Sequence, residues 1–419
     1  MTNMPQMVRL RKQENGGSLP SVLIAIGVGA LLLAPFLAHV SSRMLATRAA
    51  EDDSAELYAA DSGIEFAIWH LDNDSTYRAA VDSGSDSPLT LTVNGETVSV
   101  DSTALPPGEW TELADTLDTV GPGGSLAFGG DGLIYALRGN NSRQAWRYNP
   151  ATDSWSDFGV SDAPDSVGSG GSLLRKSGDE FYVLRGGGTA DFWSYNSSSD
   201  AWDSTLSSLS DCNNSSPTAG SGASLVSGSG NQIFALAGDN STDFCRYQTN
   251  PDKWQDRENT PGSVGAGGDF GTGAGNSIYA FRGAGTTDFW ELGGNNWSTS
   301  PANAPAAVGA GGSLAGDGGT YIYALRGNGT TDFWRYNLSA GIWEQLFPTP
   351  ESVAGGADLV HDGSTSLYAM QGAQDTGFWK FEITPPRYDI QATAGDSTIL
   401  ARVEFATDGT ISVIFWDIQ

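Results

Sequence analysis

Hydrophobic and polar positions follow two distinct patterns in the first 72 residues. Residues 19–40 are almost continuously apolar, and such a run is long enough to cross about 30 Å of hydrocarbon as a helix. After residue 41, apolar residues return every three to four positions, as at Leu57, Ala60 and Ile64, a spacing typical of an amphipathic helix. We therefore predict one long helix over residues 18–72, apolar all round at first and amphipathic later.

A different pattern recurs six times between residues 120 and 383. Each copy has a glycine-rich segment, a hydrophobic strand and a strand with an aromatic pair, as in VGPGGSLA (120–127), IYALRG (134–139) and QAWRY (144–148). A Trp follows the aromatic strand in five copies, at Trp155, Trp202, Trp254, Trp297 and Trp343. Short strands of this kind, separated by Gly, Asn, Ser and Asp turns, predict four-stranded sheets stacked radially into a β-propeller.

Residues before the first copy can close the ring. Trp110, in EWTEL (109–113), precedes Trp155 by 45 residues, and the sixth copy lacks an outer strand after Phe381. We therefore predict that 109–113 pairs with the strand around 377–383. The propeller then has six blades and spans residues 108–383.

The two flanks of the propeller predict a second, smaller domain. Residues 88–100 alternate around Asn94-Gly95, a two-residue hairpin signal, and residues 388–417 hold three more alternating runs. Segments 73–107 and 384–419 together supply about five strands, which can pack on the helix at 45–71. The expected fold class is mainly β, with a six-bladed propeller inserted in a small α+β domain.

Composition and charge exclude several classes of function. The 419-residue chain has 49 Asp and Glu against 21 Lys and Arg, a net charge of −28, which argues against nucleic acid and anionic membrane surfaces as partners. With 39% hydrophobic residues and 13 Trp, the chain is too apolar to be a disordered acidic protein. The three basic residues Arg9, Arg11 and Lys12 precede the apolar run, which predicts a cytoplasmic N-terminus with the rest of the chain outside.

The N-terminal region resembles the type IV pilin and pseudopilin superfamily. The resemblance rests on the basic residues Arg9 to Lys12, Gly17, the apolar run, and YAADSGIEFAIW at 58–69. It implies that 1–17 is a leader cleaved after Gly17, that Ser18 becomes a methylated N-terminus, and that helix 18–71 joins other pilin-like subunits after a membrane-bound stage. The family usually has Glu five residues into the mature helix, where this chain has Val22, as in minor, tip-located subunits. The alternative is a plain single-pass anchor followed by a helical stalk.

The repeat resembles the kelch propeller. Glycines lie near a Tyr-bearing strand, an aromatic strand follows, and a Trp comes last. The kelch Gly-Gly after the second strand mostly reads Arg-Gly in this sequence, so the match is loose.

The arginines of that Arg-Gly step are the candidate ligand-binding residues. Four of them occupy one equivalent position, namely Arg138, Arg185, Arg282 and Arg326, and an Asp recurs nearby, as at Asp191 and Asp288. One interpretation is a structural Arg–Asp ion pair repeated with the fold. The other is a ring of Arg at the channel mouth that binds anionic sugars. Occurrence in most copies favours the ion pair.

Other chemistry-bearing residues are few. His39, His70 and His361 share no repeat position, so we expect no catalytic residues, no metal site and no cofactor. Cys212 and Cys245 fall in the longest copy, which predicts a structural disulfide outside the cell, the alternative being two unpaired buried thiols. Glycosylation sequons occur in turn regions at Asn140, Asn196, Asn240, Asn328 and Asn337.

These features predict a non-enzymatic protein of the cell surface or an extracellular filament. The leading hypothesis is a minor pilus tip subunit whose propeller acts as an adhesin, binding carbohydrate or a surface protein. The alternative is a single-pass, lectin-like surface protein without a filament. An enzyme on a propeller scaffold ranks third, because no nucleophile or clustered acid–base motif is found and fold alone does not fix function.

Overall fold

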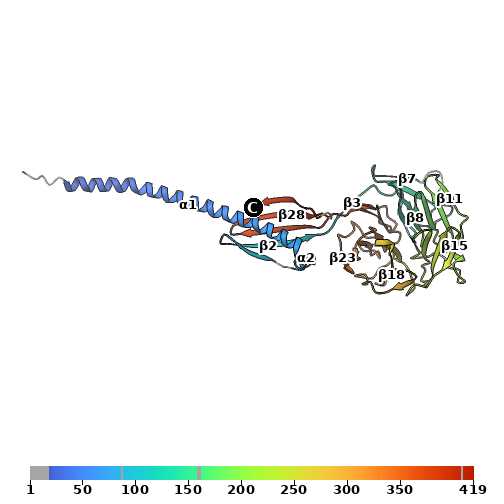
Figure 1. Ribbon diagram of the computed structural model, residues 1–419. Helices are drawn as coiled ribbons and strands as arrows, with labels where there is room; N and C mark the ends of the chain where they lie inside the picture. The colour runs from blue at the N-terminus through green and yellow to red at the C-terminus, as the bar shows by residue number, and fades with distance from the viewer. Residues whose placement is uncertain (1–17, 86–87, 158–161, 407–408) are drawn as a thin grey trace, which may run out of the picture. The chain divides into compact units, whose positions relative to one another are not determined.

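The chain folds into two compact units, which we describe separately. The computed structural model describes residues 18–85, 88–157, 162–406 and 409–419, with the side chains of helix residues 18–36 outside that description. One unit comprises Met1–Leu105 with Arg387–Gln419, and the other comprises Pro106–Pro386 (Figure 1). We call them the helix–sheet unit and the ring unit.

The helix–sheet unit combines one long helix with a five-stranded antiparallel sheet. Its strand order is β1-β2-β27-β28-β29, so the two strands that precede the ring unit join the three strands that follow it, and neither flank forms the sheet alone. The elements are α1 (Ser18–Asn73), α2 (Ser75–Asp82), β1 (Leu89–Val93), β2 (Glu96–Leu105), β27 (Arg387–Ala394), β28 (Ser397–Phe405) and β29 (Ile411–Ile418). Asn94 and Gly95 form the tight β1–β2 turn with φ of 53° and 94°, as the Asn-Gly signal predicts.

The amphipathic half of α1 packs on this sheet. Ala60, Ile64 and Ala67 are fully buried and share one core with Val98 of β2 and Ala392 of β27. Gly63 allows the close approach, since a Cβ there would lie 2.8 Å from Val98 Cγ1. Helix α1 also extends N-terminal to this contact, and residues 41–54 of that extension are exposed to solvent.

Helix α2 is not among the elements that the sequence pattern predicts. It begins after Asp74, whose carboxylate accepts hydrogen bonds from the backbone N–H groups of Thr76 and Tyr77, a standard N-cap. Tyr77 and Val81 point into the core. Eight residues are too few for a periodic signal to stand out in the sequence.

The predicted membrane-spanning run falls mostly outside the description of side chains. Among the residues whose side chains are described, no helix is both long and apolar enough to span a bilayer. Residues 19–36 of the run and the predicted leader 1–17 lie beyond that part of the chain.

The ring unit is a β-propeller-like arrangement of six four-stranded antiparallel sheets. Each sheet starts with an inner strand and ends with an outer one, and successive inner strands are in contact all the way round, with β24 next to β4. The first three sheets consist of β4 (Ser125–Phe128), β5 (Ile134–Leu137), β6 (Ala145–Asn149) and β7 (Ser154–Asp157); β8 (Ser172–Ser177), β9 (Glu180–Leu184), β10 (Phe192–Asn196) and β11 (Ala201–Asp203); and β12 (Ser224–Ser227), β13 (Gln232–Leu236), β14 (Phe244–Thr249) and β15 (Asp252–Asp256). The other three consist of β16 (Asp269–Thr272), β17 (Ile278–Phe281), β18 (Phe289–Gly293) and β19 (Asn296–Ser298); β20 (Ser313–Gly316), β21 (Tyr321–Leu325), β22 (Phe333–Asn337) and β23 (Ile342–Gln345); and β24 (Asp358–His361), β25 (Ser366–Met370), β26 (Phe378–Glu382) and β3 (Glu109–Glu112).

The ring closes where the N-terminal strand joins the last sheet. β3 pairs antiparallel with β26, with Trp110 opposite Phe381, so the predicted pairing of 109–113 is confirmed. An isolated β-bridge between Val120 and Asp375 completes the set that links each sheet to the next. The chain therefore enters and leaves the ring unit at the same sheet.

Four of the recurrent Trp residues tie neighbouring sheets together at the outer edge through their indole N–H groups. The indole N–H of Trp254 donates to the carbonyl of Ser207, which follows the outer strand of the preceding sheet. Trp110, Trp155 and Trp343 donate in the same way to Phe347, Ala114 and Ala302. The aromatic strands also interlock, since the Phe192 ring lies 4.9 Å from that of Trp254 in the next sheet. The periodic Trp thus stabilises the ring.

Candidate functional site

The inner strands place one polar residue from each sheet around the axis of the ring unit. These six residues open the inner strands and end the glycine-rich segments, and we call them the axial ring: Ser125, Ser172, Ser224, Asp269, Ser313 and Asp358. Four are serine and two are aspartate. In the sequence these residues follow a Gly-Gly or Gly-Ala pair in each copy. Their shared position at the axis appears only when all six segments meet.

Glycines bring the six segments close enough to form the axial ring. At Gly222, φ is +85° and a Cβ would lie 2.0 Å from the carbonyl oxygen of Gly265 in the next sheet. Only glycine tolerates both that backbone conformation and that contact. The glycine-rich segments are therefore the packing surface of the axis.

The axial ring is held by hydrogen bonds from one sheet to the next. The backbone N–H of Leu173 donates to Ser125 Oγ at 3.0 Å, and that of Leu225 donates to Ser172 Oγ at 3.1 Å. The two aspartates take part in the same pattern, with Leu314 N–H donating to Asp269 at 2.8 Å. Most of the ring's polar groups thus serve to join sheets.

The two aspartates are linked through one hydroxyl group. Ser313 Oγ lies 2.7 Å from Asp358 Oδ1 and 3.0 Å from Asp269 Oδ2. A hydroxyl has one hydrogen to donate, so it satisfies both carboxyl groups only when one of them is protonated. Burial, and secondly the Asp358 charge, raises the pKa of Asp269 to about 7, and burial also raises the pKa of Asp358. The pair therefore holds a proton under mildly acidic conditions.

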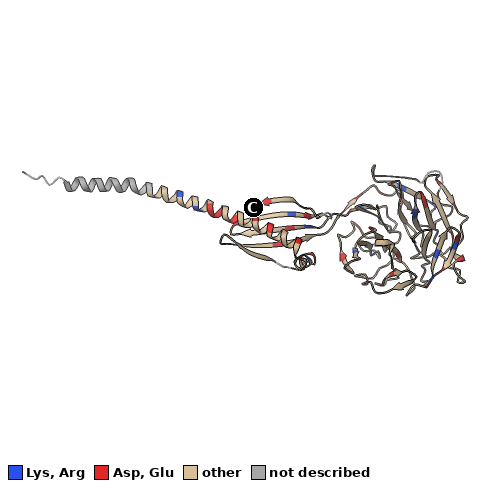
Figure 2. Cartoon of the chain, viewed as in Figure 1, with Lys and Arg blue, Asp and Glu red and all other residues tan. Residues whose placement is uncertain are grey.

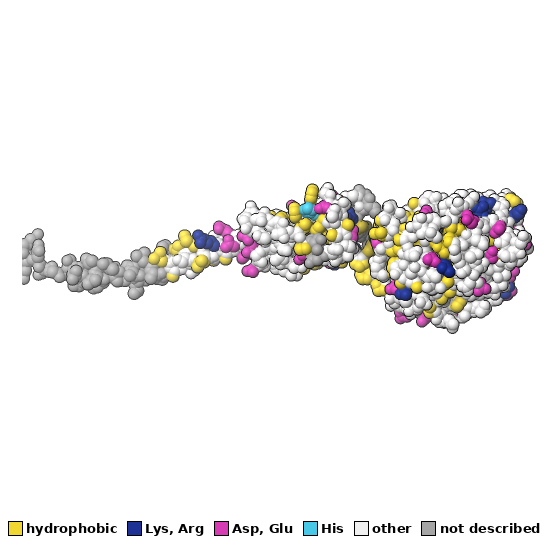
Figure 3. All heavy atoms as spheres, turned by 90° about the horizontal axis from the view of Figure 1, so that it is seen from below, with side chains coloured by type: hydrophobic (Ala, Val, Ile, Leu, Met, Phe, Trp, Pro, Cys, Tyr) yellow, Lys and Arg dark blue, Asp and Glu magenta, His cyan; other side chains and the backbone are white. Residues whose placement is uncertain are grey.

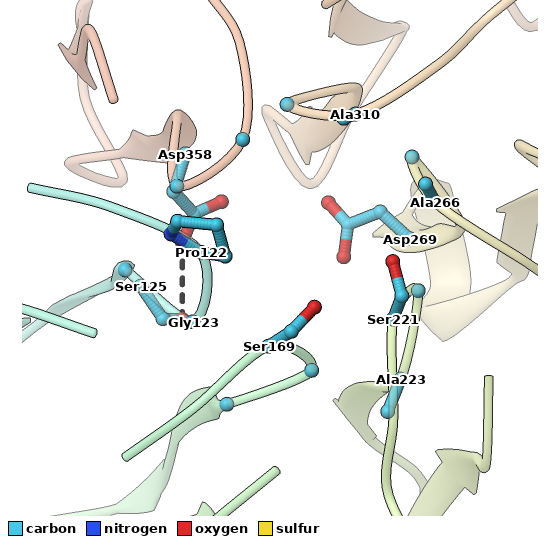
Figure 4. A pocket seen from close by; sticks show the side chains of 18 of the residues that line it. Pro122, Gly123, Ser125, Ser169, Ser221, Ala223, Ala266, Asp269, Ala310 and Asp358 are labelled. Carbon is cyan, nitrogen blue, oxygen red and sulfur yellow. Dashed lines mark hydrogen bonds between the residues drawn. The ribbon is translucent and has the colours of Figure 1, made fainter. Parts of the chain in front are cut away.

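A small cavity lies on each side of the axial ring. The cavity of about 150 Å³ is bounded by the glycine turns, with small residues such as Pro122, Ser169 and Ser221 around it (Figure 4). The other, of about 380 Å³, is lined by the remainder of the inner strands, including Arg175 and His361. Asp269 and Asp358 border both cavities. The space suits water or a small polar group.

The four candidate arginines form ion pairs, and none of them lines either of these two cavities. Arg282 and Arg326 pair with Asp288 and Asp332 at 2.8 and 2.6 Å. Arg185 pairs with both Asp165 and Asp191, and Arg138 pairs with Asp118. In every case Nε also donates to a backbone carbonyl in the segment leading to the glycines, namely that of Thr119, Ser166, Ser263 or Ala307. The geometry favours the ion-pair interpretation over a ring at the channel mouth.

The remaining candidate residues lie away from the axis. Cys212 and Cys245 form a disulfide that joins the end of the 3₁₀ turn η1 (Leu209–Asp211) to β14. The sequon asparagines Asn140, Asn196, Asn240 and Asn328 are exposed, whereas Asn337 is half-buried. Gly17 lies outside the described residues, and Ser18 is the first residue of α1.

No metal site stands out in the part of the chain that the structure describes. No group of three His, Cys, Asp or Glu side chains within it is placed to hold an ion. The two axial aspartates are instead occupied by hydrogen bonds from serine hydroxyls and backbone N–H groups.

Comparisons with known proteins give low similarity. No family model and no curated protein matches the chain. The solved structure of YjhT has 14% sequence identity and a TM-score of 0.48, over 72% of this chain and 99% of that one. A Bacteroides thetaiotaomicron protein of unknown function has 11% identity and a TM-score of 0.48, over 71% and 82% of the two chains. Scores this low decide nothing about function, so the functional conclusion rests on the geometry above.

Proposed function

We propose that this chain is a non-enzymatic surface subunit that carries a six-bladed, kelch-like propeller as a binding head on a pilin-like stem. The observation that carries the proposal is the insertion point. The ring unit is inserted between β2 and β27, which are neighbours in one sheet, with Leu105 directly opposite Arg387. The chain leaves the sheet at Leu105 and returns to it at the paired residue Arg387. The helix–sheet unit can therefore fold with the ring unit as an insertion.

The long helix supports the role of a stem. It has 56 residues, which corresponds to about 84 Å at 1.5 Å per residue. Only its last part, from about Ala59, is buried on the sheet, and residues 41–54 are exposed. Figure 2 marks the acidic and basic positions along this free part of α1, and Figure 3 shows charged and hydrophobic side chains together there. A helix so much longer than its own sheet serves to reach or bind something else.

The features of the axis support a binding role over an enzymatic one. The polar atoms of the axial ring are committed to inter-sheet hydrogen bonds, which leaves them poorly placed to act as acid, base or nucleophile. A propeller-like fold by itself fixes no ligand. The proposed ligand class is carbohydrate or a surface protein, and the proposed position is a filament tip.

The mature N-terminus is the first test of the stem. Mass spectrometry of the protein from its native host should give a chain that starts at a methylated Ser18. An intact Met1 would contradict the pilin-like route and favour the alternative, a single-pass lectin-like surface protein. Immunogold labelling of sheared filaments with an antibody to the ring unit should then mark filament ends, whereas label confined to the cell envelope would contradict a filament role.

A further inference from the structure

The last strand of the helix–sheet unit exposes an apolar surface at the edge of the sheet. β29 carries five large apolar side chains that are 41–56% exposed, namely Val413, Ile414, Phe415, Trp416 and Ile418. Edge strands of soluble proteins are normally protected by Lys, Pro or several charges, and the only charged residue in β29 is Asp417. A contiguous apolar edge of this kind marks an interaction surface.

The backbone of β29 also offers a free hydrogen-bonding edge. At one end Gln419 exchanges two hydrogen bonds with Thr398 of β28, and at the other Thr410 O accepts from Ala406 N–H. Backbone groups alternate in direction along a strand, and the register shift opposite Arg402 and Val403 inserts one extra residue, Ile414. Counting from both ends, the groups that point away from β28 belong to Ile411, Val413, Trp416 and Ile418.

The same four residues lie on the face of the sheet that α1 covers elsewhere. They stand opposite Phe405, Val403, Ala401 and Ile399, all of which belong to the buried core. Helix α1 contacts β1, β2, β27 and β28, so it is displaced toward the β1 side of the sheet. Ile411 still packs against the core, but Val413, Trp416 and Ile418 on the α1 face of β29 are left exposed within the described chain.

We propose that β1 of a second copy of this chain adds to β29 as a parallel strand and brings the α1 of that copy over the exposed face of β29. Four antiparallel steps separate β1 from β29, so the two strands run in the same direction. Copies related by a sideways shift therefore join β29 to β1 with their stems parallel. Neighbouring strands lie about 4.8 Å apart and a helix is about 10 Å across with its side chains, which brings the second copy's helix within reach of β29.

The β1 edge suits pairing with β29, because its apolar side chains lie on the same face of the sheet and it carries no charge. Leu89, Leu91 and Val93 lie on the α1 side, and Thr90 and Thr92 lie on the other. No residue of β1 is charged, so none opposes Asp417 with a like charge. The joined sheet would continue one apolar face from the first copy to the second.

Pairing of β29 with β29 of another copy fits less well. Two antiparallel β29 strands would turn the stems in opposite directions and leave both helices on the far sides of the joined sheet. Val413, Trp416 and Ile418 of each copy would then stay uncovered. Pairing of β29 with β1 covers them and can repeat from copy to copy, as head-to-tail contacts do. It goes beyond the proposed function, since it requires at least two copies side by side.

Cysteine cross-linking of the full chain in detergent tests the contact directly. We would label two preparations differently, one carrying Ser412→Cys on β29 and the other Thr90→Cys or Thr92→Cys on β1, and oxidise them separately and mixed. The expected result is a cross-linked dimer only in the mixture. Absence of that dimer, or self-cross-linking of chains with Phe415→Cys alone, would overturn the proposal.

A matched pair of substitutions gives an independent measurement. Ile418→Lys places a charge in the proposed contact, whereas Ile342→Lys places one on a strand of the ring unit at nearly equal exposure, 52% against 56%. Sedimentation velocity should show association at least about tenfold weaker for Ile418→Lys, because burying an unpaired charge costs more than 1.4 kcal/mol, and no change for Ile342→Lys. Equal association of both variants, with circular dichroism showing both folded, would overturn the contact. The start of the mature chain would be unaffected, so the stem proposal is tested separately.

Discussion

The two units of this protein differ in how completely each one covers its own apolar surface. Of the thirteen large hydrophobic side chains that are exposed in the described chain, ten belong to the smaller helix–sheet unit and only Leu117, Ile342 and Phe347 to the ring unit. The ring unit closes on itself through an isolated β-bridge from each sheet to the next. The sheet of the helix–sheet unit instead ends in β29, an edge strand with exposed apolar side chains. A closed ring suits a head displayed on its own, and an incompletely covered sheet with a long free helix suits assembly.

The largest expected difference between the two units is in pH dependence: the free energy of unfolding of the ring unit should depend strongly on pH. Asp269 has its pKa raised to about 7 from an ordinary value of 3.8, and the pKa of Asp358 is raised as well. The folded ring therefore keeps a proton that the unfolded chain releases above about pH 4, so stability is full below pH 4 and falls as pH rises through 7. The change can reach about 4 kcal/mol, from roughly three pKa units at 1.36 kcal/mol each.

Urea unfolding followed by tryptophan fluorescence between pH 4 and pH 8 measures this change. Asp358→Asn should lessen the pH dependence, because it removes the neighbouring charge that, after burial, raises the pKa of Asp269. Asp332→Asn is the control, since Asp332 is partly exposed and paired with Arg326, and it should leave the slope unchanged. A ring unit whose stability rises from pH 4 to pH 8 would contradict the shared proton.

The axial pair also marks the limit of what the sequence predicts. Strands, turns and ring closure follow from local patterns, because each copy repeats the same spacing of Gly, Tyr and Trp and the Asn-Gly hairpin is a two-residue signal. That Asp269 and Asp358 meet through Ser313 depends on three copies more than 40 residues apart in sequence. A local sequence pattern cannot show that residues so far apart in the chain come into contact. The sequence likewise shows the apolar run of β29 but not that α1 stops short of it.

Replacing a closely packed glycine by alanine should destabilise the ring unit more than the helix–sheet unit. Gly222→Ala adds a Cβ that meets the backbone of Gly265, at a position where φ is +85°. The substitution should cost about 3 kcal/mol from strain and overpacking together. Gly63→Ala meets only side chains, the nearest being Val98 Cγ1, and gains about 1 kcal/mol of helix propensity. Its net cost should be about 1 kcal/mol.

Gly285→Ala separates the two causes at Gly222, since φ is +71° there but a Cβ would meet nothing within 4 Å. It should cost about 1–2 kcal/mol for the backbone conformation alone. Denaturant midpoints of the three variants give the order directly. If Gly63→Ala proves as costly as Gly222→Ala, the ring is no more tightly constrained than the sheet, and the contrast between the units fails.

The recurrent arginines should have the smallest effect, and on stability alone. Arg282→Gln removes an ion pair with Asp288 and a hydrogen bond to the carbonyl of Ser263, at a side chain that is 28% exposed. Partly exposed pairs of this kind contribute about 1 kcal/mol or less, so a small fall in the free energy of unfolding is expected, and it should shrink further in high salt. A sulfated or sialylated glycan that binds the full chain should bind the variant equally well, because the Arg282 guanidinium lines neither axial cavity and is already paired with Asp288. Loss of glycan binding with unchanged stability would instead make these arginines the binding residues of the ring unit, and would move the site from the axis to the segments that join neighbouring sheets.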